Sequence, residues 1–424
     1  MIRNGKKKAI SCALVAAMSV GLAACGTTSY DFKVSYDGIK TGDVSSKVSV
    51  HDPSILKADG EYYIFGSHMS AAKSSDLLNW EKVADGYSKK NPVYGQIYDV
   101  ADEAFAYSGS KNSLIKTDDK QVHVWAPDVI YNETTGLYYM YYCTTSTWNA
   151  SNLCYGTSTT PEGPYEWQGA LIYSGFNRKT ISGTDVLDYV DEDYAYKNYI
   201  KGAQYNYEDY PNAIDPTVFY DADGRMWMVY GSWSGGIFLL EIDKTTGLVI
   251  HPEADKANNV DPYYGKRLLG GGHISIEGPY IMYDETSGYY YLFVSYGALT
   301  SNGGYQVRVF RSKTVDGEYV DMNGKYPEKS AQHQNFGLKL TGNYKLPSLE
   351  KAYMATGHNS AFVDDDGRMY LVYHTRFNDN GEGHSPRVHQ MLVNEDGWPC
   401  ELPYQTQGET VNKDGYDADD IIGR

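Results

Sequence analysis

The sequence has little cysteine, a deficit of positive charge and no long apolar run after its N-terminus. Five cysteines among 424 residues are too few for a disulfide scaffold, and their spacing matches no zinc site. Cys143 and Cys154 either pair across a hairpin or stay free thiols. Acidic residues outnumber basic ones by 54 to 37, and the net charge of −17 would repel nucleic acid, so we expect no such partner.

The N-terminus has the form of a bacterial lipoprotein signal peptide. Basic residues between positions 3 and 8 precede an apolar stretch from Ala9 to Val20, and Leu22-Ala23-Ala24-Cys25 matches a lipobox. The stretch is too short for a membrane span. We therefore expect residues 1–24 to be removed, Cys25 to carry a lipid, and residues 25–47 to form a flexible tether. The protein would then be exported and anchored to the membrane at the cell surface.

Tyrosine and glycine are abundant, and they recur in order. Five times a polar side chain is followed eight to eleven residues later by a turn glycine and then by a tyrosine-rich segment. The turn glycines are Gly60, Gly136, Gly224, Gly288 and Gly367. Residues 221–230 and 364–373 are identical at seven of ten positions. Asp-Gly followed by alternating aromatic and β-branched residues is a strong hairpin signal.

The distances between these glycines favour one architecture. They are 76, 88, 64 and 79 residues, too long for a solenoid but enough for a four-stranded sheet plus loops. Five such sheets can close radially into a β-propeller, which leaves only short, protected edges. We therefore predict an all-β protein with a five-bladed β-propeller over residues 48–404.

Polar residues near the starts of the five repeats form a candidate site. In a propeller the first strand of each blade lies nearest the axis, so these residues converge at one end of the channel. They are Asp52, Asp128, Asp215, Glu277 and His358. Four carboxyls and an imidazole in one funnel are costly to desolvate, and like charges shift each other's pKa. The pattern therefore indicates an active site.

Five motifs around these residues carry a family resemblance. They are Val50-His51-Asp52-Pro53-Ser54-Ile55, Trp125-Ala126-Pro127-Asp128, Asn212-Ala213-Ile214-Asp215-Pro216, Ile276-Glu277-Gly278-Pro279 and Gly357-His358-Asn359. In these motifs the chain resembles glycoside hydrolase family 43, and most of all its endo-acting α-1,5-L-arabinanases. Five motifs in register are far more specific than any single one.

The resemblance implies a role for four of these side chains. Asp52 would be the general base, Glu277 the general acid, and Asp215 the carboxylate that tunes the acid and orients substrate. His358 would belong to a metal site on the axis, with calcium as the usual ion. Inverting hydrolysis needs an acid and a base roughly 6.5–9.5 Å apart. A nearby ionised Asp215, helped by partial burial, is expected to raise the pKa of Glu277.

Each of these residues also has a structural interpretation. An aspartate before proline often caps a turn, although the fivefold register favours a functional role for Asp52 and Asp215. Asp128 is open between holding a turn, binding substrate and touching the chemistry. His358 is open between a metal site and a hydrogen-bonded channel histidine, because calcium prefers oxygen ligands.

Substrate contacts are expected from the third and second repeats. The segment around Trp233 resembles the family's stretch that lines the sugar subsites, and Ala150 stands where the family has a glycine. The alternative for the aromatic residues is ordinary sheet packing. The predicted contacts are Asn212, Ala213, Ile214, Ser232, Trp233, Ser234, Ala150 and Asp128.

Two insertions and the C-terminal tail complete the organisation. Residues 81–121 and 175–211 are aromatic, acidic and loop-like, and we expect them to build the walls of a groove that holds several sugars. Residues 405–424 resemble the opening of a small C-terminal β domain. The sequence leaves open whether the chain is naturally short or a fragment.

The expected activity is hydrolysis of internal α-1,5-L-arabinofuranosidic bonds in arabinan by an inverting acid/base mechanism. One alternative is an exo-acting β-xylosidase or α-L-arabinofuranosidase of the same family. Another is a non-catalytic, lipid-anchored propeller that binds oligosaccharides. A binding protein gains nothing from a carboxyl held protonated, so the combination of acid, base and tuning carboxylate favours an enzyme. No organic cofactor is expected.

Overall fold

A computed structural model describes residues 46–109, 114, 123–145, 147–326, 335–345, 350–379, 381 and 383–405. The predicted signal peptide, the lipidation site Cys25, nearly all of the predicted tether and the tail beyond residue 405 lie outside the described residues. Within the described part, no helix is long and apolar enough to cross a membrane.

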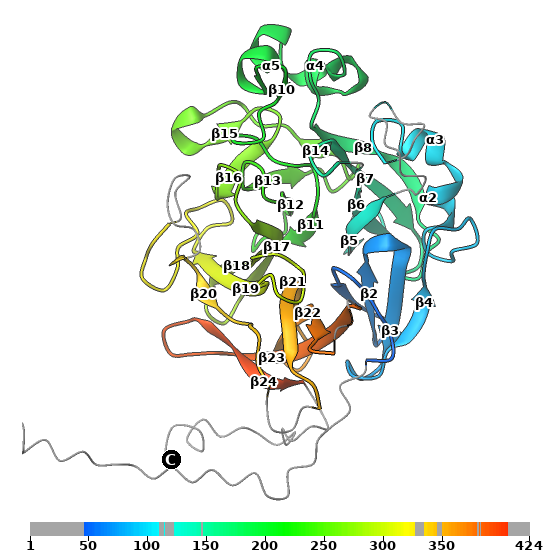
Figure 1. The fold of residues 1–424 in the computed structure, drawn as a ribbon, viewed down its shortest axis with the longest axis vertical. Coiled ribbons are helices and arrows are strands. Elements are labelled where there is room, and N and C mark those ends of the chain that lie inside the picture. Colours follow the sequence, from blue (N-terminus) through cyan, green and yellow to red (C-terminus); the bar gives the residue numbers. More distant parts are fainter. Residues whose placement is uncertain are drawn as a thin grey trace, which may run out of the picture. The chain divides into compact units, whose positions relative to one another are not determined.

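The chain folds into antiparallel sheets whose strands follow one another in sequence (Figure 1). The first sheet contains β1 (Ser54–Ala58), β2 (Glu61–Gly66), β3 (Ser70–Ser74) and β4 (Glu81–Ala84). The second contains β5 (Val124–Asn132), β6 (Leu137–Thr145), β7 (Ser151–Ser158) and β8 (Glu166–Ser174). The third contains β11 (Thr217–Tyr220), β12 (Met226–Tyr230), β13 (Ile237–Ile242), β14 (Val249–Ile250), β15 (Val260–Asp261) and β16 (Gly265–Leu269).

The last sheet has eight strands in two runs. The first run is β17 (Ile276–Asp284), β18 (Tyr289–Tyr296), β19 (Gln306–Ser312) and β20 (Leu338–Lys339). The second is β21 (Tyr353–Val363), β22 (Met369–Phe377), β23 (Ser385–Val393) and β24 (Pro399–Gln405). A single parallel pair, Gln306 with Thr356, joins the runs. The all-β class is confirmed, whereas the number of blades stays a prediction.

The predicted turn glycines lie where the sequence places them. Gly60, Gly136, Gly224, Gly288 and Gly367 separate the first two strands of each repeat, and all have φ between 64° and 81°. Glycine takes this left-handed conformation without the steric cost that a Cβ atom adds. The tyrosine-rich strands that follow are largely buried, so their aromatic residues fill the layers between neighbouring sheets.

A second backbone feature recurs at the entrance to each first strand. Asp52, Ala126, Asp215, Gly278 and His358 have φ values of 56°, 40°, 54°, 56° and 48°. Four of the five precede a proline. A positive φ costs a non-glycine residue on the order of 1–3 kcal/mol, and such strain persists where the surroundings enforce it. The kink therefore marks equivalent positions of the five repeats.

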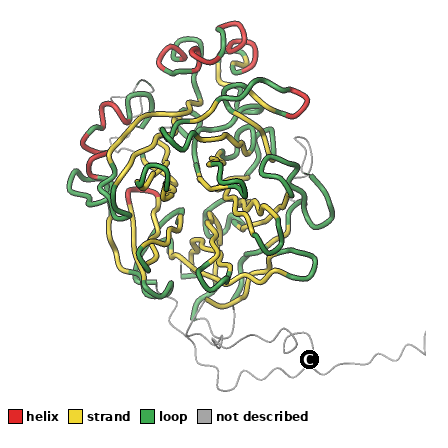
Figure 2. Tube along the Cα trace, turned by 180° about the vertical axis from the view of Figure 1, so that it is seen from behind, coloured by secondary structure: helices red, strands yellow, loops and turns green. Residues whose placement is uncertain are grey.

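The helices are short and lie mainly away from the centre of the strand arrangement (Figure 2). They are α2 (Gly95–Asp99), α3 (Ala101–Ala104), α4 (Val186–Tyr189) and α5 (Glu192–Asn198), with 3-10 turns η1 (Ser67–Met69), η2 (Ile181–Gly183) and η3 (Lys256–Asn258). Helices α4 and α5, with the small hairpin β9 (Ile200–Lys201) and β10 (Gln204–Tyr205), form the second insertion.

The second insertion is packed rather than loop-like. Its residues Val186, Ala195, Tyr199 and Tyr205 join the hydrophobic core of the second and third sheets. The Tyr199 hydroxyl donates to Asp261 Oδ1 at 2.8 Å. Burial of these side chains holds the insertion against the third sheet.

The two internal cysteines do not pair. Cys143 and Cys154 are both buried free thiols. Cys143 faces Leu153 across the β6 and β7 ladder, and Cys154 faces Tyr142, so the two sulfurs belong to opposite faces of the sheet. Of the two possibilities that the sequence leaves open, the structure has the free thiols.

Candidate active site

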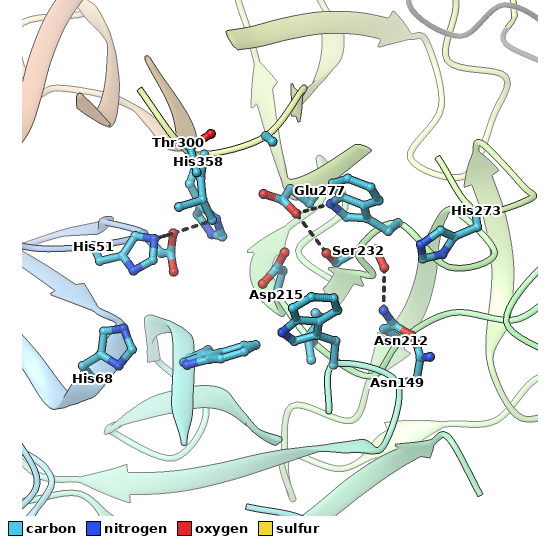
Figure 3. A pocket seen from close by; sticks show the side chains of 17 residues that line it. His51, His68, Asn149, Asn212, Asp215, Ser232, His273, Glu277, Thr300 and His358 are labelled. Atoms are coloured by element: carbon cyan, nitrogen blue, oxygen red, sulfur yellow. Dashed lines mark hydrogen bonds and ion pairs between the residues drawn. The ribbon is translucent and has the colours of Figure 1, made fainter. Parts of the chain in front are cut away.

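The entrances of the first strands surround a cavity of about 350 Å³. Figure 3 shows polar side chains from all five repeats directed into it. Its lining residues are His51, Asp52, His68, Trp125, Trp148, Asn149, Asn212, Ile214, Asp215, Ser232, Trp233, His273, Glu277, Ala298, Leu299, Thr300 and His358. Asp52, Asp215, Glu277 and His358 are therefore brought together as the sequence predicts.

Asp52 lies among imidazole rings on one side of the cavity. Its Oδ1 is 3.0 Å from Nδ1 of His358 and 3.1 Å from Nε2 of His51, contacts drawn as dashed lines in Figure 3. Its Oδ2 accepts a hydrogen bond from the Ser67 hydroxyl. Burial alone would raise the pKa of Asp52, but His358, His51 and Ser67 outweigh it and lower the pKa to about 2. Asp52 is thus a carboxylate at neutral pH.

Glu277 lies on the opposite side with a different set of partners (Figure 3). Its Oε2 accepts hydrogen bonds from Nε1 of Trp233 at 2.6 Å and from the Ser232 hydroxyl at 3.3 Å. Burial is the largest influence and raises the pKa of Glu277, with the charge of Asp52 acting in the same direction. The Trp233 hydrogen bond and His358 oppose this rise. Burial, rather than repulsion by Asp215, is thus the main cause.

Asp215 lies beside Glu277 (Figure 3). Its Oδ2 accepts a hydrogen bond from the Gly278 amide at 3.1 Å. Burial, together with the charges of Glu277 and Asp52, raises the pKa of Asp215 to about 7. Because like charges resist ionising together, ionisation of either Asp215 or Glu277 makes ionisation of the other less favourable.

His358 interacts electrostatically with all three carboxyl groups. Burial lowers its pKa, but Asp52, Asp215 and Glu277 outweigh burial and raise it. Its amide donates to the Ser295 hydroxyl at 2.7 Å. Calcium takes six to eight oxygen ligands. Among the described residues, no group of three carboxylate, imidazole or thiolate ligands forms around His358, so the side chains do not build a calcium cage.

Four of the predicted substrate contacts line the cavity and four do not. Asn212, Ile214, Ser232 and Trp233 line it. Ala213 and Ala150 are buried in the packing beneath it. Ser234 is fully buried, with its hydroxyl 3.3 Å from Oδ1 of Asn149 and from Nδ1 of His273.

Asp128 is the fourth predicted substrate contact that does not line the cavity, and the alignment of the repeats explains its position. Counted from the kink, Asp128 is equivalent to Ser54, and it is the fifth residue of β5. Its Oδ1 accepts from the Ser54 hydroxyl and its Oδ2 from the Val218 amide at 2.6 Å. It is 2% exposed and ties the second repeat to the first and third. Of the roles left open for it, the structure favours a structural one.

The position before the kink supplies two cavity residues that the sequence did not single out, His51 and Trp125. His51, Trp125, Ile214 and Glu277 occupy it in four repeats, and all four line the cavity. The proline after the kink marks this alignment in the sequence. His273 and the loop 298–300 also line the cavity, and no sequence motif marks them.

Neither insertion contributes to the lining as the structure describes it. The cavity contains no residue of 81–109 or 175–211. The first insertion contacts the lining through Tyr87, whose hydroxyl lies 3.0 Å from Nδ1 of His68. The second contacts it through the ring of Tyr207, which packs edge-on to His273 with the ring centroids 5.8 Å apart. The described parts of the insertions thus contact residues of the cavity without lining it, and the expectation that they wall a groove for several sugars stays a prediction.

An all-β scaffold that brings three carboxyl groups into one cavity, one with a lowered pKa and two with raised pKa values, has the paired acid and base that glycoside hydrolysis requires. The family model described as glycosyl hydrolases family 43 matches residues 44–210 and 191–399. The chain therefore belongs to glycoside hydrolase family 43, and it is a glycosidase.

Individual relatives share most of the chain. It is 40% identical over 387 residues to an extracellular endo-α-(1→5)-L-arabinanase of Thermotoga petrophila, covering 88% of this chain and 74% of the relative. It is 37% identical to extracellular endo-α-(1→5)-L-arabinanase 2 of Bacillus subtilis, covering 87% and 74%. The crystal structure of endo-1,5-α-L-arabinanase from T. petrophila matches with a TM-score of 0.71 at 39% identity, covering 88% of this chain and 77% of that one.

Proposed function

We propose that the protein hydrolyses internal α-1,5-L-arabinofuranosidic bonds of arabinan by an inverting mechanism. The observation that carries the proposal is that Asp52 and Glu277 line one cavity with opposite pKa shifts. The relatives named above are endo-acting arabinanases at close to 40% identity over most of the chain. Their activity fits a site with one ionised and one protonated carboxyl group.

The two carboxyl groups divide the proton transfers. Asp52, held ionised by imidazoles, removes a proton from the attacking water. Glu277, held protonated by burial, gives its proton to the departing glycosidic oxygen. Asp215 shares the proton with Glu277, so it keeps the acid protonated and presents a carboxylate to the sugar once that proton is transferred.

The shape of the cavity suits a polymer. Trp148 lines it and is nevertheless 68% exposed, so the indole face is available for stacking on a sugar outside the central cavity. Asn212 donates from Nδ2 to the Ser232 carbonyl at 2.9 Å, which fixes the segment that carries Trp233. Aromatic rings at the edge of the site and carboxyl groups at its base favour binding of an internal segment of the polysaccharide.

Several finer predictions accompany this function. We propose that the sheets form five blades, with the eight-stranded sheet counted as two because one residue pair joins its halves. A calcium ion near His358 would take most of its ligands from water. The relatives are called extracellular, which supports export, and a lipid anchor at Cys25 is proposed from the sequence alone.

Linear arabinan tests the function directly. Early products analysed by size should be mixed oligosaccharides, and proton NMR of the first-formed product should show inverted anomeric configuration. Arabinose as the sole early product would indicate an exo-acting enzyme and contradict the proposed endo action. Binding without new reducing ends would leave only an oligosaccharide-binding protein. The same assay after treatment with a chelator, and again after calcium is added back, tests the proposed ion.

A further inference from the structure

Three histidines form a cluster beside Asp52. His51, His374 and His384 present one ring nitrogen each within 4.8 Å of one another. They come from the start of the first repeat, from β22 and from the loop before β23. His51 stacks on His384 with ring centroids 3.8 Å apart, and His374 meets His384 edge-on at 4.6 Å. The cluster is the one such group of potential metal ligands among the described residues.

The nitrogens of this cluster lack partners. Nδ1 of His51, Nε2 of His374 and Nε2 of His384 are buried without a hydrogen-bond partner among the described residues. Buried polar atoms are nearly always paired, and an unpaired group indicates a water or an ion that satisfies it. Burial also lowers the pKa of His51 to about 4 and of His384 to about 2, so both rings are neutral at pH 7. Neutral imidazole is the form that ligates metals.

A cavity leads from the surface to this cluster. It has a volume of about 430 Å³, and His51, His68 and His384 line it together with Ser67. His51 and His68 also line the catalytic cavity, so the two spaces share a wall. Ligand identity, ligand count, supporting contacts and an entry path are the features by which a metal site is judged, and this cavity supplies the path and room for water ligands.

We propose that His51, His374 and His384 form a binding site for a divalent transition-metal ion such as Zn²⁺, with Asp52 as the carboxylate that supports it. Imidazole nitrogen suits zinc, nickel and copper, whereas calcium takes oxygen. The site is thus chemically distinct from a calcium site near His358. Water from the adjoining cavity completes the coordination.

The supporting contacts match those of ligating histidines. A histidine that binds metal through one nitrogen donates its other N–H to a carboxylate or carbonyl. Nε2 of His51 lies 3.1 Å from Oδ1 of Asp52, which leaves Nδ1 for the ion. Nδ1 of His374 lies 3.8 Å from the same oxygen and also accepts from the Asp52 amide at 3.2 Å. Accepting at Nδ1 places the ring proton of His374 on Nε2. Ligation through Nε2 therefore requires the opposite tautomer, in which the hydrogen bond from the Asp52 amide gives way to a contact between Nδ1 and the carboxylate.

Binding also requires a small movement. Zinc–nitrogen bonds of about 2.0–2.1 Å in a tetrahedral site separate the ligand nitrogens by roughly 3.4 Å, so the cluster must contract. The stacked rings of His51 and His384 hold their planes within 12°, which directs their lone pairs nearly in parallel. The His384 ring must therefore turn. His384 precedes β23 and lies outside a strand, so no strand hydrogen bonding holds its backbone.

Calorimetric titration of the full chain with ZnCl₂ tests the site independently of activity. Wild type should bind one Zn²⁺, and His384→Gln should weaken that binding by more than about 10-fold, the lower end of what loss of even an outer supporting contact costs. The matched control is His251→Gln, which removes a histidine that contacts Tyr189 and Tyr263 far from the cluster and should bind as wild type does. Calcium should not displace the zinc.

Two further readouts keep the test decisive. Co²⁺ should give a visible absorption spectrum of nitrogen coordination in wild type and in His251→Gln, but not in His384→Gln. Anomalous diffraction from a Zn²⁺-soaked crystal should place the ion among the three rings. Absence of zinc binding in wild type, equal binding by His384→Gln, or an anomalous peak elsewhere would overturn the proposal. Because activity enters none of these readouts, failure here leaves the arabinanase function untouched.

Discussion

The two sides of the catalytic cavity hold the same functional group in opposite states. On one side, Asp52 contacts two imidazoles and a hydroxyl, and its pKa falls to about 2. On the other, Glu277 has an indole and a hydroxyl as partners, and burial raises its pKa. Both carboxyl groups are buried, so burial alone cannot separate them. The contacts of Asp52 with His358, His51 and Ser67 outweigh burial, whereas those of Glu277 do not.

The largest expected effect comes from removing either carboxyl group. Asp52→Asn and Glu277→Gln should each lower kcat on linear arabinan by on the order of 10²–10⁴-fold, because each removes one proton transfer. Both changes are nearly isosteric, so circular dichroism melting should show a fold retained. A variant that keeps wild-type turnover would remove that residue from the chemistry.

Replacing the indole that touches the acid should shift the pH profile. The Trp233 N–H stabilises the ionised form of Glu277 and so holds its pKa down. Trp233→Phe keeps an aromatic ring but loses that bond, so the pKa rises and the alkaline limb of kcat/KM moves to higher pH by about one to two units. We also expect kcat to fall about 10-fold, because the acid is less well oriented.

Trp125→Phe is the matched control for this prediction. Trp125 lines the same cavity, and its indole nitrogen has no hydrogen-bond partner among the described residues. The variant should change KM without moving the alkaline limb. Equal shifts in the two variants would contradict the role given to the Trp233 hydrogen bond.

On the opposite side, Ser67 should control the acidic limb. Its hydroxyl donates to Asp52 Oδ2 and thereby lowers the pKa of the base. Ser67→Ala should raise that pKa, so activity is lost at a higher pH on the acidic side, by about one unit. Ser70→Ala, whose hydroxyl donates to the Ser67 carbonyl instead, should leave the limb in place. An acidic limb that does not move in Ser67→Ala would contradict the claim that Ser67 lowers the pKa of Asp52.

The smallest effect is expected at the lip of the cavity. Trp148→Ala should raise KM for arabinan about 2- to 10-fold, since aromatic contacts contribute about 0.5–1.5 kcal/mol beyond the area they bury. Turnover of a short aryl glycoside should change little, because Trp148 is 68% exposed at the edge of the site. Parallel kinetics on the two substrates check this, and equal losses would place Trp148 in the central site.

Much of the site could be predicted from the sequence, because its residues stand in motifs that recur along the chain. Asp52, Asp215, Glu277 and His358 stand in motifs that precede turn glycines, and the structure brings them together. The role of Asp128 could not be assigned from the sequence alone. The backbone kink before it turns its carboxyl into the packing, toward Ser54 and the Val218 amide.

Other features depend on contacts that no local pattern records. His273 and Leu299 reach the cavity from loops whose positions are set by packing of distant sheets. The second insertion has a loop-like composition, yet its Tyr199 and Tyr205 are buried in the core shared with the third sheet. The origin of the raised pKa of Glu277 also required the structure, since burial depends on the whole fold.

Neutron diffraction from a substrate-free crystal at neutral pH tests the central claim most directly, because it locates deuterium on the carboxyl groups. The account predicts one deuterium on the Glu277 and Asp215 pair and none on Asp52. A deuterium on either oxygen of Asp52, or a fully ionised Glu277 and Asp215 pair, would contradict it.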